Sequence, residues 1–524
     1  MLSIRRISRL LATLGGAHAA AARSSSALRN ASCAAGHALN PAVLSPGPDG
    51  LPQFSKFDNA EVEPAITALA EEYEASLAAI EGDATAAGAA GGGGGGGGGL
   101  TWDALVPPLE RLDQRLDFAW GLVTHLDMVQ NTEGLRAAKQ RVQPLITRVA
   151  TRAAQSEALY RAARALGTAA DEAAAPGAEA EARRRVLRKM WQGAERGGVG
   201  LAGAPKERFN AIQLELAELS SAFTNNVLDS TKSFGLLLTE QADVAGFPPT
   251  LRALCAASAN AKAKADVATA AAAVAAAAAA AAEPAAGGAA AGAGAGAGGG
   301  AEAEAEAEAA TAQAATAEAG PWRVTLDAPC FGPLMQHAED RGLRERVYRA
   351  YVSRASSHSA VGDDGDGSEA AAAAAVGTGA AHDNADNIAR ILALRQEQAA
   401  LLGYASFAAK SLDAKMAPSV QAVLDLTADL RARSRGAAEQ ELAELQAFAD
   451  SARGAPAGPL KHWDLGYWSE RQRETLFSFT DEQLRPYFPL PRVLEVLFST
   501  GDFSRLLLTH DSLPTRFPFH FFYL

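Results

Sequence analysis

A zinc hydrolase of the H-E-x-x-H kind needs two histidines one helical turn apart, so that both imidazoles reach one metal ion. The glutamate between them activates the metal-bound water. The sequence contains nine histidines, of which no two are four residues apart and none is followed by glutamate. They are His18, His37, His125, His337, His358, His382, His462, His510 and His520. The sequence therefore predicts no such site, and it identifies no catalytic, cofactor-binding or metal-binding residue.

Two of the histidines lie in charged or aromatic surroundings. His337 lies in Met335-Gln-His-Ala-Glu-Asp-Arg341, and His462 lies in Lys461-His-Trp-Asp464. For each we expect a hydrogen-bonded structural role rather than metal ligation or acid–base work. Spacing alone leaves a serine or cysteine triad open, because triad members need only meet in space. No G-x-S-x-G motif supports one.

Three further motifs do not meet the requirements of a known site. The glycine run before Leu100 lacks the Gly-Lys-Ser/Thr of a phosphate loop. The stretch that begins at Asp364 resembles the start of a calcium loop, but Glu369 occupies the position that requires glycine. We interpret Arg341-Gly-Leu-Arg-Glu-Arg346 as a solvated helix face with local ion pairs.

Composition predicts an acidic, helical protein. The formal net charge is −12, although the first 48 residues carry arginine and no acid. An acidic body argues against a nucleic-acid groove, which needs a basic face. Hydrophobic residues make up 48% of the chain, but many are alanine, which favours helix and buries little area. The three cysteines form no C-x-x-C pair, which argues against a disulfide framework and indicates a reducing compartment.

The N-terminal residues have the composition of a targeting signal rather than that of a folded element. Apolar residues at near-helical spacing alternate with arginines, and a Ser/Ala-rich stretch without acids follows. Residues 1–40 are therefore predicted to be an organellar transit peptide, for the mitochondrion and/or the chloroplast. The alternative is a disordered N-terminal tail. No membrane span is expected, because the uncharged run near the middle of the chain, residues 267–282, is short and almost pure alanine.

Four low-complexity segments divide the chain: residues 82–99, 167–182, 256–320 and 359–381. Each has too little apolar surface to offset its ordering entropy, so each is predicted to be a flexible surface insertion. The predicted organisation is an N-terminal helical region over 51–255, the long insertion at 256–320, and a second body over 321–499.

The segments between the insertions have helical periodicity. Apolar residues from Leu105 to Val123 recur at steps of three and four, with Thr101 as a predicted N-cap and Asp103 in the first turn. The same period predicts helices over 209–227, 392–402 and 420–448. Short strands are predicted at 234–239 and 322–326. The fold class is therefore mainly α with minor β.

Several blocks of sequence, in order along the chain, resemble the thimet oligopeptidase and oligopeptidase A family of zinc metallopeptidases. They cover most of residues 51–499 apart from the insertions. The clearest are Thr101-Trp-Asp-Ala-Leu-Val-Pro-Pro-Leu109, Lys206-Glu-Arg-Phe-Asn-Ala-Ile-Gln213, Gly320-Pro-Trp-Arg-Val-Thr-Leu-Asp327, Tyr348-Arg-Ala-Tyr-Val-Ser-Arg-Ala-Ser356, Tyr467-Trp-Ser-Glu-Arg471 and Arg485-Pro-Tyr-Phe488.

This resemblance implies an elongated, neurolysin-like helical body with a channel that admits short peptides as substrates. It also implies a zinc cofactor, but the family's zinc helix lies beyond the Arg485 block. No zinc ligand is identifiable in this chain, and no catalytic residue can be carried over. The chain is therefore expected to stop before the zinc-binding catalytic region and to be inactive alone.

The ending departs from the family pattern. Residues 500–524 have no helical period and place five aromatic residues among the last eight. We expect an aberrant tail, of the kind that a retained intron or a shifted frame produces. The leading hypothesis is thus an organellar oligopeptidase A-like endopeptidase that degrades short peptides, including cleaved targeting peptides. The alternatives are a non-catalytic peptide-binding or regulatory protein and a helical scaffold that binds no peptide.

Overall fold

The structure is a computed structural model that describes residues 43, 45–47, 51–90, 100–172, 177–281, 315–357, 382–454, 458–497 and 499. The predicted transit peptide (1–40), the insertion at 359–381 and the predicted aberrant tail (500–524) lie outside the described residues. The chain forms two compact units, and each is discontinuous in sequence. Unit 1 comprises Met1–Thr224 and Asp386–Leu424, and unit 2 comprises Asn225–Ala385 and Asp425–Leu524. This division by compactness differs from the division by composition that the sequence predicts.

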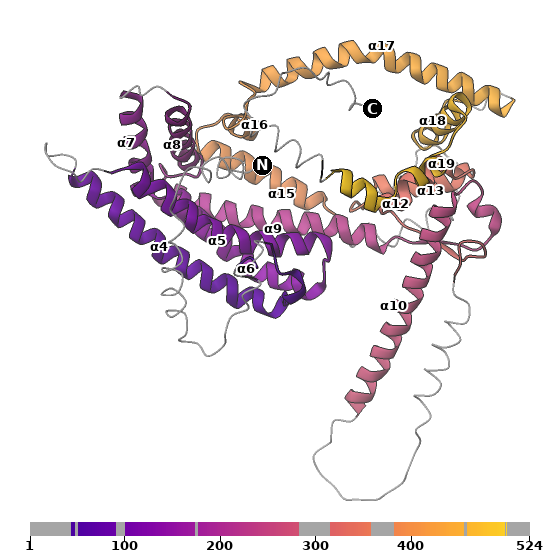
Figure 1. Cartoon of the computed structure of the whole chain (residues 1–524), viewed down its shortest axis with the longest axis horizontal. Helices are drawn as coiled ribbons and strands as arrows, with labels where there is room; N and C mark the ends of the chain where they lie inside the picture. Colours follow the sequence, from indigo (N-terminus) through magenta and orange to yellow (C-terminus); the bar gives the residue numbers. More distant parts are fainter. Residues whose placement is uncertain are drawn as a thin grey trace, which may run out of the picture. The chain divides into compact units, whose positions relative to one another are not determined.

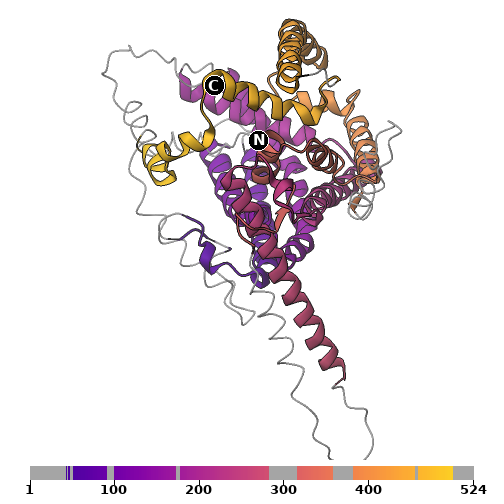
Figure 2. The same ribbon diagram turned by 90° about the vertical axis from the view of Figure 1, so that its right-hand side faces the viewer.

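Unit 1 is a helical bundle whose main elements follow one another along the chain (Figure 1). Two short 3-10 turns, η2 (Phe54–Lys56) and η3 (Asn59–Glu61), precede it. The bundle consists of α4 (Val62–Ala90), α5 (Trp102–Val129), α6 (Glu133–Ala154), α7 (Glu157–Glu172), α8 (Ala178–Arg196), the first part of α9 (Gly203–Ser233), α15 (Ala385–Leu401) and α16 (Phe407–Leu412). The indigo and purple helices lie side by side in both views (Figure 2).

The predicted helix over 101–126 is confirmed as α5, and its apolar stripe is the reason that it packs. The Thr101 hydroxyl accepts a hydrogen bond from the Ala104 N–H at 3.3 Å, as an N-cap does. Leu105, Leu122 and Val123 are buried against α4 and α6. Two apolar clusters form along this bundle, one around Ile66 and one around Leu105. The stripe predicted for 209–227 likewise falls within α9.

Unit 2 combines a small antiparallel sheet with several helices. Strands β1 (Leu236–Leu238) and β2 (Trp322–Val324) pair with Leu237 opposite Arg323, which confirms both predicted strands. The other elements are η4 (Gln241–Val244), α10 (Pro249–Ala281), α12 (Ala328–His337), α13 (Arg341–Val352), α17 (Val420–Arg453, which begins in unit 1), α18 (His462–Phe477), α19 (Asp481–Leu484) and η6 (Arg485–Tyr487). Trp322 is 1% exposed at the centre of the core. Cys255 and Cys330 are free thiols in the same core.

Helices reach further into the low-complexity segments than the predicted bounds of the insertions allow. Helix α4 continues through 82–90, and α10 continues through 256–281. The far half of α10 projects away from the rest of its unit, and its described side chains beyond residue 260 are nearly all exposed (Figures 1 and 2). Alanine has the highest helix propensity of any residue, so it extends a helix whose first turns are packed. No described helix combines the length and the apolar character that crossing a membrane requires.

One buried carboxylate joins α12, α13 and α18. Asp464 on α18 is 1% exposed, and its oxygens accept hydrogen bonds from Arg341 at 2.8 and 2.9 Å and from Arg344 at 3.1 Å. Arg344 is also 1% exposed, and it donates to the Ala338 carbonyl at the end of α12 at 2.7 Å. Although burial raises the pKa of Asp464, the hydrogen bonds from Arg341, the Lys461 N–H and Arg344 hold it below its usual value.

This contact corrects the interpretation of residues 341–346 as a solvated face with local ion pairs. Arg341 and Arg344 instead pair with a carboxylate about 120 positions away, and Arg344 lies in the interior. A local charge pattern cannot indicate a partner at that separation. Only the Arg349–Glu345 pair on this helix is of the local i, i+4 kind that was expected.

We predict that Asp464→Asn destabilises the protein strongly. The substitution leaves Arg344 buried without its counter-charge, and breaking a buried pair in this way costs about 3–5 kcal/mol. Urea unfolding followed by tryptophan fluorescence measures the change. Asp429→Asn is the matched control, because Asp429 pairs with Arg433 on an exposed helix surface, where such a pair is worth about 0–1 kcal/mol. Similar losses for the two variants would contradict the prediction.

Candidate metal centre

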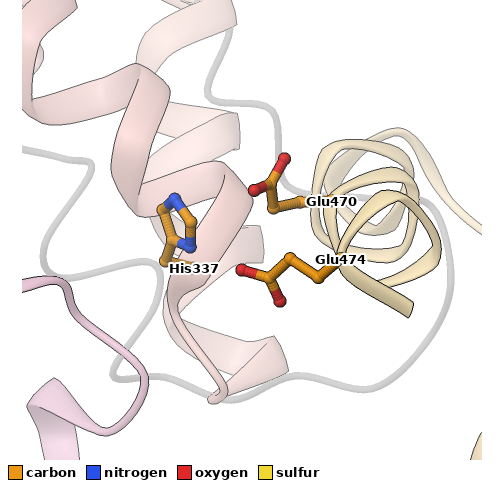
Figure 3. A group of neighbouring side chains, drawn as sticks. All are labelled: His337, Glu470 and Glu474. Atoms are coloured by element: carbon orange, nitrogen blue, oxygen red, sulfur yellow. The ribbon is translucent and has the colours of Figure 1, made fainter. Parts of the chain in front are cut away.

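The two histidines singled out in the sequence lie on neighbouring helices of unit 2. His337 is the last residue of α12, and His462 is the first residue of α18. The His462 ring lies parallel to the Tyr348 ring, with 6.0 Å between the ring centroids. His337 has a different environment, because its ring faces acidic side chains of α18 (Figure 3).

His337, Glu470 and Glu474 form the one group of potential metal ligands found among the described residues. Each side chain offers a ligand atom, and these atoms all lie within 4.8 Å of one another. Glu470 is 7% exposed, whereas the other two are half-buried. Figure 3 shows both carboxylates extending from α18 toward the imidazole on α12. One imidazole and two carboxylates are a donor set that divalent transition metals accept.

The local sequence explains why these side chains meet. Glu470 and Glu474 are four residues apart, so they project from the same face of α18. Helix α12 packs directly against α18. At Gly466 a β-carbon would lie 3.3 Å from the Met335 carbonyl oxygen, so this glycine allows the two helix backbones to approach closely. His337, two residues after Met335, is thereby brought to the acidic face.

Two arginines already neutralise the carboxylates. Nη2 of Arg471 lies 3.1 Å from both Glu474 Oε2 and His337 Nδ1. Arg473 pairs with Glu470 through two nitrogens and also contacts Asp481. Because a guanidinium only donates hydrogen bonds, the Nδ1 atom of a neutral His337 must act as the acceptor. The cluster is therefore an ion-pair network in which Arg471 is the central cation.

The protonation states follow from these contacts. Burial, together with the positive charge of Arg471, lowers the pKa of His337 below its usual value, and the ring is neutral at pH 7. The hydrogen bond from Arg473 lowers the pKa of Glu470, which keeps that carboxylate ionised. A neutral imidazole and ionised carboxylates are also the forms in which these groups bind metals.

The cluster does not fit the catalytic zinc that the family resemblance implies. A zinc hydrolase site needs an open position for water and a nearby free carboxylate as the base. Here only one histidine is present, and both carboxylates are paired with arginines. Arg471 also donates to Nδ1, one of the two ring nitrogens that could bind a metal. We therefore derive no hydrolytic step from these residues.

Sequence reasoning named His337 but missed both of its acidic neighbours. The i, i+4 spacing of Glu470 and Glu474 was visible, but that spacing is common on solvated helices and does not reveal a histidine on another helix. Sequence reasoning also missed Lys410 in unit 1. The Lys410 Nζ lies 2.5 Å from Gln398 Oε1 and over the Phe407 ring. Burial lowers the pKa of Lys410 to about 8.

We predict that His337 makes stability depend on pH below neutrality. Its pKa is lower in the folded state than the unfolded value of about 6.5, so acid favours the unfolded chain. The stability that neutral His337 contributes is full above pH 6.5 and is lost as the pH falls below it. The charged groups that act on the ring are Arg471, Glu470 and Glu474 on α18 and Asp481 on α19.

His337→Asn tests this, because an amide oxygen keeps an acceptor and does not titrate. Urea midpoints of wild type and variant between pH 7.5 and 5 should diverge as the pH falls, with wild type losing more. Parallel curves would show that His337 titrates normally.

Two models of known protein families match this chain, one in its N-terminal part and one in its C-terminal part. Residues 66–206 match the model of the neurolysin/thimet oligopeptidase N-terminal domain, and residues 369–503 match peptidase family M3. The probable cytosolic oligopeptidase A of Arabidopsis thaliana is 35% identical over 447 residues, which are 85% of this chain and 51% of that protein. The chloroplastic/mitochondrial organellar oligopeptidase A of the same plant is 34% identical over 86% of this chain and 45% of its own length.

A bacterial relative shows the same extent of similarity. Oligopeptidase A of Escherichia coli (strain K12) is 32% identical over 86% of this chain and 53% of its own length. The chain thus spans about half the length of the curated relatives that it matches. The mainly α fold agrees with these matches. The chain belongs to the thimet oligopeptidase and oligopeptidase A family.

Proposed function

We propose that this protein is an oligopeptidase A-like zinc metalloendopeptidase that acts on short peptides, including cleaved targeting peptides, in an organelle. The observation that carries the proposal is the continuous similarity of more than four fifths of the chain to proteins named oligopeptidase A. The proposed substrates are peptides short enough to enter a channel in a helical body. The proposed domain order is a transit peptide (1–40), a helical region (51–255), and the start of the metallopeptidase body (321–499).

We propose further that these 524 residues are inactive by themselves. Hydrolysis in this class uses a zinc-bound water that a glutamate activates. The sequence contains no H-E-x-x-H, and the His337 cluster does not fit such a centre. The chain's own proposed contribution is therefore the helical framework that receives a peptide.

A second candidate function is non-catalytic peptide binding or regulation. Helix α17 favours it, because large apolar side chains on this helix face solvent. Val423 is 39% exposed, and Leu424 and Leu430 are each 57% exposed. Exposed apolar patches of this kind mark surfaces that bind other chains. The same helix has few buried residues along its length.

We predict that the purified full chain does not cleave a quenched fluorescent oligopeptide above background, whether or not zinc is added. Cleavage that a chelator abolishes would contradict the proposed inactivity. Isothermal titration calorimetry with the same peptide separates the remaining hypotheses. Binding without cleavage supports a peptide-receiving framework, and Leu424→Glu and Leu430→Glu test whether α17 contributes to it. Absence of binding favours the scaffold that binds no peptide.

We predict that residues 1–40 direct a fused fluorescent protein to mitochondria or chloroplasts. The arginine-rich, acid-free composition supports this localisation, and one organellar relative agrees with it. Replacing Arg5, Arg6 and Arg9 with glutamate should leave the reporter in the cytosol. A cytosolic signal from the unaltered fusion would instead match the cytosolic relative, which is about equally similar.

A further inference from the structure

We propose that His337, Glu470 and Glu474 form a latent site for a divalent transition metal, and that the Arg471 guanidinium occupies this site in the native fold. The metal and the guanidinium would be alternative occupants of one place. The proposal concerns binding alone, and it is independent of peptidase activity.

The positions of the donors support binding of one ion. A zinc ion holds imidazole nitrogen and carboxylate oxygen at about 2.0–2.2 Å, so ligands of one ion lie at most about 4 Å apart. The three ligand atoms already lie within 4.8 Å of one another, which is close to the spacing that one ion requires. The two carboxylates approach the imidazole from one helix face (Figure 3).

Arg471 lies where the ion would bind. Its Nη2 contacts Glu474 Oε2 and His337 Nδ1, both at 3.1 Å, and so bridges two of the three donors. The hydrogen bond from Arg471 occupies the Nδ1 lone pair, which is the lone pair that a metal at that nitrogen would need. A metal can therefore bind only when this guanidinium moves away.

The guanidinium is only partly satisfied in this position. Its Nε is buried without a hydrogen-bond partner, which makes this position unfavourable for the side chain. The Arg471 side chain is 27% exposed, so it has a route to solvent. Exchanging the Arg471 guanidinium for a divalent ion raises the local charge by one.

Zinc binding by the full chain tests the proposal, measured by isothermal titration calorimetry in a buffer that does not coordinate metals. Arg471→Met should bind zinc at least about tenfold more tightly than wild type. Adding His337→Ala or Glu474→Gln to that variant should abolish the gain. Arg485→Met is the matched control, because it removes an exposed arginine of neighbouring η6 that pairs with Glu482, and it should bind zinc as wild type does.

Two further measurements guard against a change in folding. Circular dichroism and thermal melting establish whether Arg471→Met is folded, and Arg471→Gln serves as the second variant. In wild type, excess zinc should raise the melting temperature, and His337→Ala should remove that rise. Equal zinc affinity in wild type and in both Arg471 variants would overturn the proposal. A gain that survives loss of His337 would also overturn it, because zinc would then be bound elsewhere.

Discussion

The geometry of unit 2 depends on the Asp464 carboxylate, which is buried together with the Arg344 guanidinium. A charge at 1% exposure is tolerated only where an opposite charge and hydrogen bonds surround it. This requirement holds α13 against α18, and the Ala338 carbonyl that Arg344 binds adds the end of α12. Few arrangements of the three helices satisfy all of these groups at once.

The orientation that Asp464 imposes on α18 also sets the direction of the helix face that bears Glu470 and Glu474. Glu470 and Glu474 follow Asp464 by less than two and less than three helical turns, so a rigid helix fixes their direction as well. His337 directly precedes Ala338, whose carbonyl is held by Arg344. The same buried pair thus positions both sides of the His337 cluster. A structural interaction and a candidate binding site share one framework.

Much of the secondary structure could be predicted from sequence, because its causes are local. The stripe in α5, its Thr101 cap and the two short strands follow from neighbouring residues alone. The bounds of helices in alanine-rich segments were predicted less well. Low complexity predicts a flexible segment there, whereas the high helix propensity of alanine favours continuation of the helix. The partners of Arg344 and His337 could not be predicted, because those contacts join residues more than a hundred positions apart.

The family resemblance and the proposed metal site share some residues in this protein. The blocks that resemble the family include Tyr467-Trp-Ser-Glu-Arg471. This block supplies Glu470 and also Arg471, which pairs with Glu474. A carboxylate and imidazole cluster attracts a cation whatever its source, and a guanidinium on the same helix is always present at high effective concentration. A free metal ion must outcompete that tethered cation. Whether such a cluster is a metal centre or a structural ion pair is therefore decided by one neighbouring side chain rather than by the ligands themselves.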